Sequence, residues 1–211
     1  MIAHIRLANA LRGRLFRVLL ARRFGNFGRK TLVIDPIAIE GPERIHLGDD
    51  VYVAAQTCLA AEPHTGGDDC RLEIGDGCRI GRFNHIYATR RVVLGAKVLT
   101  ANNVYISDNV HGYREVSIAV MDHPVEQLRD VEIGEGSWLG HNACVLGVKI
   151  GRHCVVGANA VVTRDLPDYS VAVGAPAIVI RRYDEAAGAW RQTRSDGSFI
   201  EQTTPAASDP A

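Results

Sequence analysis

A short repeat between residues 131 and 163 limits what this chain can fold into more than any other feature. Within the stretch VEIGEGSWLGHNACVLGVKIGRHCVVGANAVVT, an apolar residue followed by glycine recurs at Ile133, Leu139, Ile150 and Val156. The step is six residues within each pair and eleven between the pairs, one short of two sixes. A hexapeptide cannot bury its own apolar residue and must stack on the next coil. The repeat therefore predicts a parallel β-helix.

The repeat extends over most of the chain and is interrupted twice. It begins near residue 33, and its apolar positions include Ile39, Ile45, Leu47, Val53, Leu59, Ile74, Ile80, Ile86, Leu94 and Ile106. Residues 61–70 contain Gly-Gly and Asp-Asp and read as a loop. Residues 112–130 break the period again, and an insertion of this length in a compact solenoid is more often functional than not. We expect a β-helix domain over residues 31–180 that carries an insertion over 112–130.

The N-terminal segment, residues 1–30, has a different pattern. Residues 2–24 show helical spacing of three and four in an apolar stripe made of Ile5, Ala8, Leu11, Leu15, Val18 and Leu19. Residues 1–34 contain eight Lys or Arg and no acidic residue. Two compatible interpretations follow: a helix that caps the open end of the solenoid, and a basic amphipathic helix that also rests on anionic lipid.

The C-terminal extension, residues 181–211, lies outside the repeat. Residues 165–180 hold two prolines and are expected to leave the coil as an extended segment. Residues 181–190 suggest a short helix, and the polar stretch from about 193 onward suggests disorder.

Composition narrows the function classes. The five cysteines (Cys58, Cys70, Cys78, Cys144 and Cys154) form no CxxC motif and are odd in number, which favours buried free thiols in a reducing compartment. No signal-peptide pattern and no apolar stretch of membrane-spanning length occur, so the cytoplasm is the expected location. The basic residues cluster on one helix without regularly interleaved aromatics, which argues against nucleic-acid binding.

Three motifs carry a family resemblance over roughly residues 30–183. They are ISDNVHGY at 106–113, VEIGEGSWLG at 131–140 and VVGANAVVTRDLPDYSVAVGAPAIVIR at 155–181. Through them the chain resembles the hexapeptide-repeat acyltransferases, and among these the galactoside and maltose acetyltransferases and the O-antigen and capsule modifying enzymes. The resemblance implies a left-handed β-helix, a homotrimer with active sites between subunits, acetyl-CoA as co-substrate, no metal, and a sugar or glycan acceptor in polysaccharide biosynthesis.

By the same resemblance, His111 is the general base that takes a proton from the acceptor hydroxyl. A sugar hydroxyl is a poor nucleophile at neutral pH, whereas histidine titrates close to that pH. Related members often carry a second histidine two residues earlier, and this chain has Asn109 there. Asp108 could orient His111 or could serve the turn.

The resemblance also maps a coenzyme A groove onto this chain. The matching positions are Trp138, Gly140, His141, Ala158, Thr163, Arg164 and Arg181. Backbone N–H groups near Gly140 and His141 would stabilise the oxyanion of the tetrahedral intermediate, and the arginines would bind phosphates. Trp138 has an alternative role, packing at a subunit interface. A basic residue is common in relatives where this chain has Ile178.

Acceptor contacts are expected on the coils before His111 and in the insertion. The candidates are Asn84, His85, Asp108 and Tyr113, since Asn and His side chains both donate to and accept from sugar hydroxyls. Asn102 and Asn103 fit better as a ladder of corner asparagines. Relatives often have one more residue before Gly147, so we predict a tightened corner there, next to the groove.

Two other functions compete with acyl transfer. A metal-dependent hydratase of the carbonic anhydrase type needs three histidines around one ion, two of them close in sequence. The closest spacing among the candidate histidines is twelve residues, which argues against it. A non-catalytic β-helix scaffold is the second alternative, and His111 in its motif argues against that.

Overall fold

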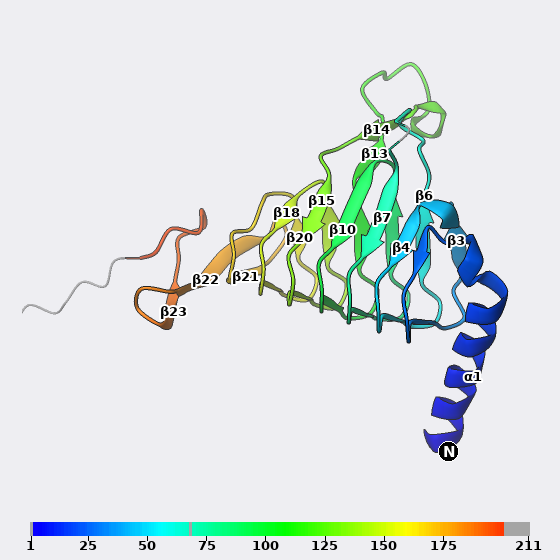
Figure 1. Cartoon of the computed structure of the whole chain (residues 1–211). Helices are drawn as coiled ribbons and strands as arrows, with labels where there is room; N and C mark the ends of the chain where they lie inside the picture. The colour runs from blue at the N-terminus through cyan, green and yellow to red at the C-terminus, as the bar shows by residue number, and fades with distance from the viewer. Residues whose placement is uncertain (1, 68, 201–211) are drawn as a thin grey trace, which may run out of the picture.

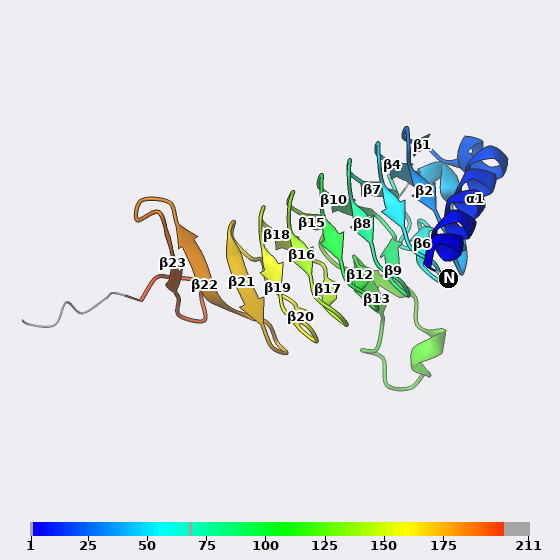
Figure 2. The ribbon, with the colours of Figure 1, turned by 90° about the horizontal axis from the view of Figure 1, so that it is seen from below.

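The computed structural model describes residues 2–67 and 69–200 and shows a triangular, left-handed parallel β-helix (Figures 1 and 2). Each turn of the chain adds one strand to each of three faces. The first face contains β1 (Asn26–Phe27), β4 (Ile45–Leu47), β7 (Arg71–Ile74), β10 (Arg91–Leu94), β15 (Val131–Ile133) and β18 (Lys149–Ile150). The predicted β-helix is confirmed.

The second and third faces follow the same parallel order. The second face contains β2 (Leu32–Val33), β5 (Tyr52–Val53), β8 (Arg79–Ile80), β11 (Leu99–Thr100), β16 (Trp138–Leu139), β19 (Val155–Val156) and β21 (Ser170–Val173). The third face contains β3 (Ala38–Glu40), β6 (Cys58–Ala61), β9 (His85–Ala88), β12 (Tyr105–Ser107), β17 (Cys144–Leu146) and β20 (Val161–Val162). Three short 3₁₀ turns are η1 (Ala21–Arg23), η2 (Pro42–Arg44) and η3 (Val120–Asp122).

The apolar repeat residues form the core by stacking in register. On the third face Ile86 pairs with Ile106, which pairs with Val145, and all three are fully buried. Because side chains alternate along a strand, their neighbours point outward and remain free for function. Each fully buried branched side chain stabilises the fold by about 1.5–3 kcal/mol relative to exposure.

The helix α1 (Ile2–Leu20) lies across the N-terminal end of the coil (Figure 1). It packs through Phe16, whose ring meets Phe24 and Phe27, and Arg17 donates to the carbonyl oxygen of Gly28 at 2.8 Å. The apolar stripe read from the sequence is largely exposed: Leu11, Leu15, Val18 and Leu19 are 66%, 59%, 78% and 65% exposed, although Leu15 and Leu19 also border a hollow against Asp35 and Pro36. The capping contact therefore uses a different side of the helix.

The C-terminal segment differs from the sequence expectation. Residues 181–190, where a short helix was expected, lie in an antiparallel hairpin of β22 (Ile178–Asp184) and β23 (Ala189–Gln192) that continues the second face from β21. Thr193 is buried against the Val179 carbonyl, and Arg182 and Arg191 lie over the ring of Phe199. Residues 193–200, which were expected to be disordered, therefore have a defined structure. Residues 201–211, for which disorder was also expected, lie outside the described residues.

Candidate active site

The insertion leaves the coil at the edge between the third and first faces. Its two limbs are β13 (Asn109–His111) and β14 (Val125–Gln127), an antiparallel ribbon in which His111 pairs with Val125. Figure 1 shows this ribbon projecting beyond the coil. The His111 side chain is exposed, and among the described residues no hydrogen bond holds its ring. The predicted base is thus carried away from its own coil.

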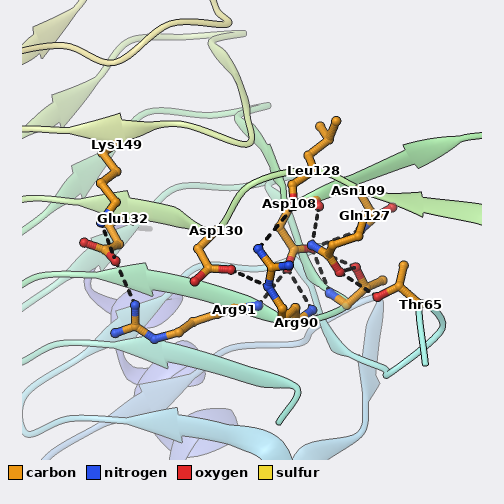
Figure 3. Close-up of polar contacts among 11 residues, drawn as sticks. Thr65, Arg90, Arg91, Asp108, Asn109, Gln127, Leu128, Asp130, Glu132 and Lys149 are labelled. Atoms are coloured by element: carbon orange, nitrogen blue, oxygen red, sulfur yellow. Dashed lines mark hydrogen bonds and ion pairs between the residues drawn. The ribbon is translucent and has the colours of Figure 1, made fainter. Parts of the chain in front are cut away.

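Asp108 holds the start of this ribbon to the coil (Figure 3). Its carboxylate accepts hydrogen bonds from the backbone N–H groups of Thr89, Arg90 and Arg91 at 2.7–2.8 Å, and the side chain is fully buried. Burial opposes ionisation of this carboxyl, but the three N–H donors outweigh it and hold the pKa of Asp108 below its usual value. Asp108 therefore serves the turn, with no surface left for an acceptor sugar.

A second loop, whose described residues are 62–67 and 69, leaves the coil at the same edge and touches the insertion. The Thr65 hydroxyl donates to the Gln127 side-chain oxygen at 2.6 Å, and the Thr89 hydroxyl donates to the same oxygen at 3.0 Å. The Gln127 side-chain amide in turn donates to the backbone carbonyl of Asp108 at 2.7 Å. The two loops therefore form one connected wall, joined through Thr65 and Gln127 (Figure 3).

The shortened corner predicted near Gly147 is at this edge too. Gly147 adopts a left-handed φ of 56°, and a Cβ there would lie 2.6 Å from the Cβ of Leu128 on the returning limb of the insertion. The missing residue thus makes room for the insertion to return to the coil.

Three predicted coenzyme positions, Gly140, His141 and Ala158, lie at another edge, between the second and third faces. The Gly140 N–H donates to the Val156 carbonyl at 2.8 Å, so it belongs to the coil ladder. Within the described chain, the N–H groups of His141 and Ala158 make no such bond. A Cβ on Gly140 would lie 2.6 Å from the Ala158 nitrogen, so glycine is needed where the coils approach. This edge presents unpaired backbone donors from successive coils.

The remaining coenzyme candidates lie on the second face, at the third–first edge and at the end of the coil. Trp138 is 45% exposed on the second face, stacked between Leu99 and Val155. Thr163 and Arg164 follow β20 and are exposed, and Arg181 is exposed on β22. Ile178 is also exposed.

The acceptor candidates separate into buried and accessible residues. Asn84 is 1% exposed: its side chain accepts from the Val104 N–H at 2.5 Å and donates to the Thr100 hydroxyl at 2.6 Å. It is a corner residue with no surface to offer a ligand. Tyr113 is exposed in the insertion, and His85 is exposed on the third face, its ring 5.5 Å from that of Tyr105.

The structure adds two residues that motif reasoning missed. His64 in the 62–69 loop hydrogen-bonds through Nδ1 to the hydroxyl of Tyr87, which lies two residues after His85 on the third face. Burial, followed by the nearby Glu40 and Glu62 carboxylates, raises the pKa of Tyr87 to about 12. The one sequence signal for His64 was its place in the first interruption of the repeat.

Elsewhere on the coil, charged side chains form ion pairs at the solvent-exposed surface. On the first face Glu132 bridges Arg91 at 2.8 Å and Lys149 at 3.2 Å (Figure 3). A shallow hollow on this face is lined by residues such as Val93, Glu132, Lys149 and Pro167, and it contains none of the predicted site residues. Over the described ranges, no group of three His, Cys, Asp or Glu is placed to hold a metal ion, and no helix is long and apolar enough to cross a membrane.

Comparisons with known proteins identify relatives of this fold. A family model, the hexapeptide repeat of succinyl-transferase, matches residues 130–164. WbbJ of Escherichia coli strain K12, a putative lipopolysaccharide biosynthesis O-acetyl transferase, is 33% identical over 146 residues, which cover 62% of this chain and 74% of that protein. A probable acetyltransferase of Mycobacterium tuberculosis is 36% identical over 65% of this chain, which spans only 42% of that relative.

Among solved structures, PerB from Caulobacter crescentus in complex with CoA and GDP-perosamine superposes with a TM-score of 0.52 at 28% identity, covering 81% of this chain and 65% of that one. The stacked coil, the insertion that carries His111 and the relation to WbbJ lead to one conclusion: this chain belongs to the hexapeptide-repeat acyltransferases, next to bacterial sugar O-acetyltransferases.

Proposed function

We propose that this protein transfers an acetyl group from acetyl-CoA to a hydroxyl of a sugar or glycan precursor, with His111 as general base. The observation that carries the proposal is the exposed His111 ring on a ribbon that projects from the coil, within the motif through which the chain resembles the sugar acetyltransferases. The name of WbbJ, a putative lipopolysaccharide biosynthesis O-acetyl transferase, supports a sugar acceptor. The CoA and GDP-perosamine bound to PerB support a CoA donor and a sugar acceptor.

The chemistry needs only groups that this fold provides. His111 accepts the proton of the acceptor hydroxyl as its oxygen attacks the thioester carbonyl, and a C–O bond forms. The carbonyl oxygen becomes an oxyanion, for which the unpaired N–H of His141 is the matching donor. Collapse breaks the C–S bond, and the protonated His111 returns its proton to the departing thiolate of CoA.

Coenzyme A would lie along the edge between the second and third faces. The small Ala158 lets the pantetheine arm approach the coil, and its unpaired N–H can donate to an amide carbonyl of that arm. Arg164 and Arg181, both exposed, would bind the phosphates. Trp138 borders the same edge.

The active form would be a homotrimer. His111 stands at the third–first edge, whereas His141 and Ala158 stand at the second–third edge of the same prism. A whole face separates the two groups, so the base of one subunit would have to meet the backbone donors of its neighbour. The exposed apolar Leu99 and Trp138 on the second face suit burial between subunits.

The helix α1 would hold this trimer against an anionic membrane surface. Its exposed stripe of Leu11, Leu15, Val18 and Leu19 is flanked by exposed Arg12 and Arg14, and the first 34 residues contain no acidic side chain. An apolar stripe bordered by arginines is typical of helices that lie in the membrane interface. A cytoplasmic enzyme that modifies lipid-linked glycan precursors would benefit from this placement.

The transfer reaction is tested by thiol release from acetyl-CoA with a panel of methyl glycosides, with the acetylated product identified by its mass. We expect sugar-dependent release; a protein that releases no thiol with any glycoside would be a scaffold instead. Analytical ultracentrifugation of the same sample measures the trimer.

Membrane contact is tested by sedimentation with vesicles of phosphatidylglycerol or phosphatidylcholine. Binding to the anionic vesicles alone is expected, with loss of binding in Val18→Ser and no loss in Val116→Ser, an exposed valine in the insertion. Equal sedimentation of Val18→Ser and the unmodified protein would overturn the membrane role.

A further inference from the structure

The wall made by the two loops contains a histidine whose orientation is set by a tyrosine. His64 lies in the 62–69 loop, and its Nδ1 is hydrogen-bonded to the Tyr87 hydroxyl, with the two rings edge to face at 6.0 Å. Tyr87 is half-buried on β9, whereas the His64 ring is exposed. The contact leaves Nε2 as the only ring nitrogen of His64 available to a ligand.

This contact determines what Nε2 can do. Because the pKa of Tyr87 is raised to about 12, its phenol keeps its proton near neutral pH and can donate it to Nδ1 of a neutral imidazole at His64. The proton of the neutral imidazole then resides on Nε2, and the imidazolium also carries a proton there. In both protonation states His64 presents an N–H donor outward. Held in this way it cannot act as a base.

The ribbon places His111 on the side of the wall where His64 lies. Residues paired across a ribbon, and residues two apart along it, have side chains on the same face. The pairs Asn109–Gln127 and His111–Val125 therefore put the His111 side chain on the face that Gln127 uses to contact Thr65. Thr65 is the residue next to His64, so a donor and a base border the same side of the ribbon.

We propose that His64 is an acceptor-binding residue, which donates its Nε2–H to an oxygen of the same sugar whose hydroxyl is deprotonated by His111. Tyr87 is the positioning residue that keeps this donor oriented. The exposed His85 ring, next to Tyr87 and Tyr105, continues the surface on which the sugar would lie. The inference rests on the proposed acetyl transfer and assigns two further residues to its acceptor side.

Two amide variants of His64 separate ligand binding from loop structure. The amide nitrogen of glutamine reaches the position of Nε2, whereas that of asparagine reaches only the position of Nδ1. His64→Gln keeps the outward donor, and His64→Asn keeps the contact with Tyr87 but loses the donor. Both are compared with the unmodified protein by steady-state kinetics on the best methyl glycoside of the panel.

We expect His64→Asn to raise KM for the glycoside about tenfold, the effect of one lost hydrogen bond, with KM for acetyl-CoA unchanged. His64→Gln should stay within about threefold of the unmodified protein, and Tyr87→Phe should raise the glycoside KM by about threefold through loss of orientation. A purely structural role would change both Michaelis constants or the thermal midpoint instead.

Equal glycoside KM values for His64→Asn and the unmodified protein would overturn this inference while leaving acetyl transfer in place. If the unmodified protein transfers acetyl to no glycoside, the proposed function fails and this inference fails with it. A 15N-correlated NMR spectrum of the imidazoles gives an independent check, because neutral His64 must carry its proton on Nε2. A proton on Nδ1 would contradict the orientation.

Discussion

Two edges of the same prism are built in opposite ways. At the second–third edge each coil turns through a single left-handed residue, as at Asn103, Asn142 and Asn159, and the step never varies. At the third–first edge the turns vary in length: Thr89 lies in a plain corner, residues 62–69 and 109–127 are loops, and Gly147 lies in a shortened corner. The regular edge presents backbone N–H groups, and the irregular edge presents side chains.

The difference shows how a regular repeat fold can position catalytic side chains. A strict repeat can place identical backbone donors in a column but cannot bring a base out to meet a substrate. A break in the repeat can do so if the point where it leaves the coil is held in place. Here the hydrogen bonds of the buried Asp108 carboxylate hold it. Substitution of an exposed side chain at the irregular edge should therefore change catalysis, whereas substitution of the buried Asp108 or of a corner residue at the regular edge should change stability.

The largest effect is expected from His111→Ala. Loss of a positioned general base should lower kcat by about 10²- to 10⁴-fold with little change in thermal midpoint, because the ring is exposed and makes no hydrogen bond to the described chain. Thiol release measures this. His153→Asn, at the first–second edge in a left-handed position that asparagine tolerates, should retain activity. Full turnover by His111→Ala would remove the base assignment.

Asp108→Asn should destabilise the irregular edge most. The amide would place its NH₂ group among the N–H donors of Thr89, Arg90 and Arg91, leaving buried donors unpaired at a cost of about 2–4 kcal/mol. Urea unfolding measures the loss, and faster hydrogen exchange at residues 109–127 should accompany it. An unchanged unfolding midpoint would show that Asp108 does not secure the insertion.

The same carboxyl predicts acid sensitivity. Since the pKa of Asp108 is lower in the folded protein than in the unfolded chain, its stabilisation is present above about pH 4 and is lost as pH falls through the folded pKa. Thermal midpoints between pH 3 and pH 6 should fall more steeply for the unmodified protein than for Asp108→Asn. Parallel curves would mean that other carboxyls govern the acid transition.

Gly140→Ala tests the regular edge. The added methyl group would lie 2.6 Å from the Ala158 nitrogen and 2.8 Å from the Val156 oxygen, both backbone atoms, so the coils must separate at a cost of about 1–3 kcal/mol. Gly67→Ala is the matched control, because an added Cβ there meets open space. Similar unfolding free energies for the two variants would show that the coil spacing can relax freely.

The smallest effect is expected at a single rung of the asparagine ladder. Asn142→Ala forces alanine into φ 58° and removes the bond to the Asn159 side chain, for about 1–2 kcal/mol. Asn142→Gly, which adopts this φ without strain, should cost less. Urea unfolding of the pair compares them, and a more stable alanine variant would contradict the conformational argument.

The sequence predicted correctly the residues whose role follows from their position in the repeat. It did not predict the environment of residues whose contacts come from distant parts of the chain. The coil, the missing residue before Gly147 and the corner role of Asn103 all follow from position within the hexapeptide. Asn84 was expected to contact the acceptor beside His85, yet its side chain is buried in a corner, where its partners Val104 and Thr100 come from the next coil. The stripe on α1 was visible, but which side of the helix meets the coil depends on Phe16 and the phenylalanines it contacts.

The opening repeat by itself determined the stacked coil and its period, because each apolar residue can be buried only by the same position in the next turn. It also determined where the repeat breaks, and therefore where side chains can leave the surface. Only the tertiary structure decided that residues 62–69 and 109–127 leave at one edge, that Asp108 is buried as their anchor, and that Tyr87 holds His64. These contacts join segments from different coils, and the physical reason is that charge burial and hydrogen-bond pairing depend on neighbours in space.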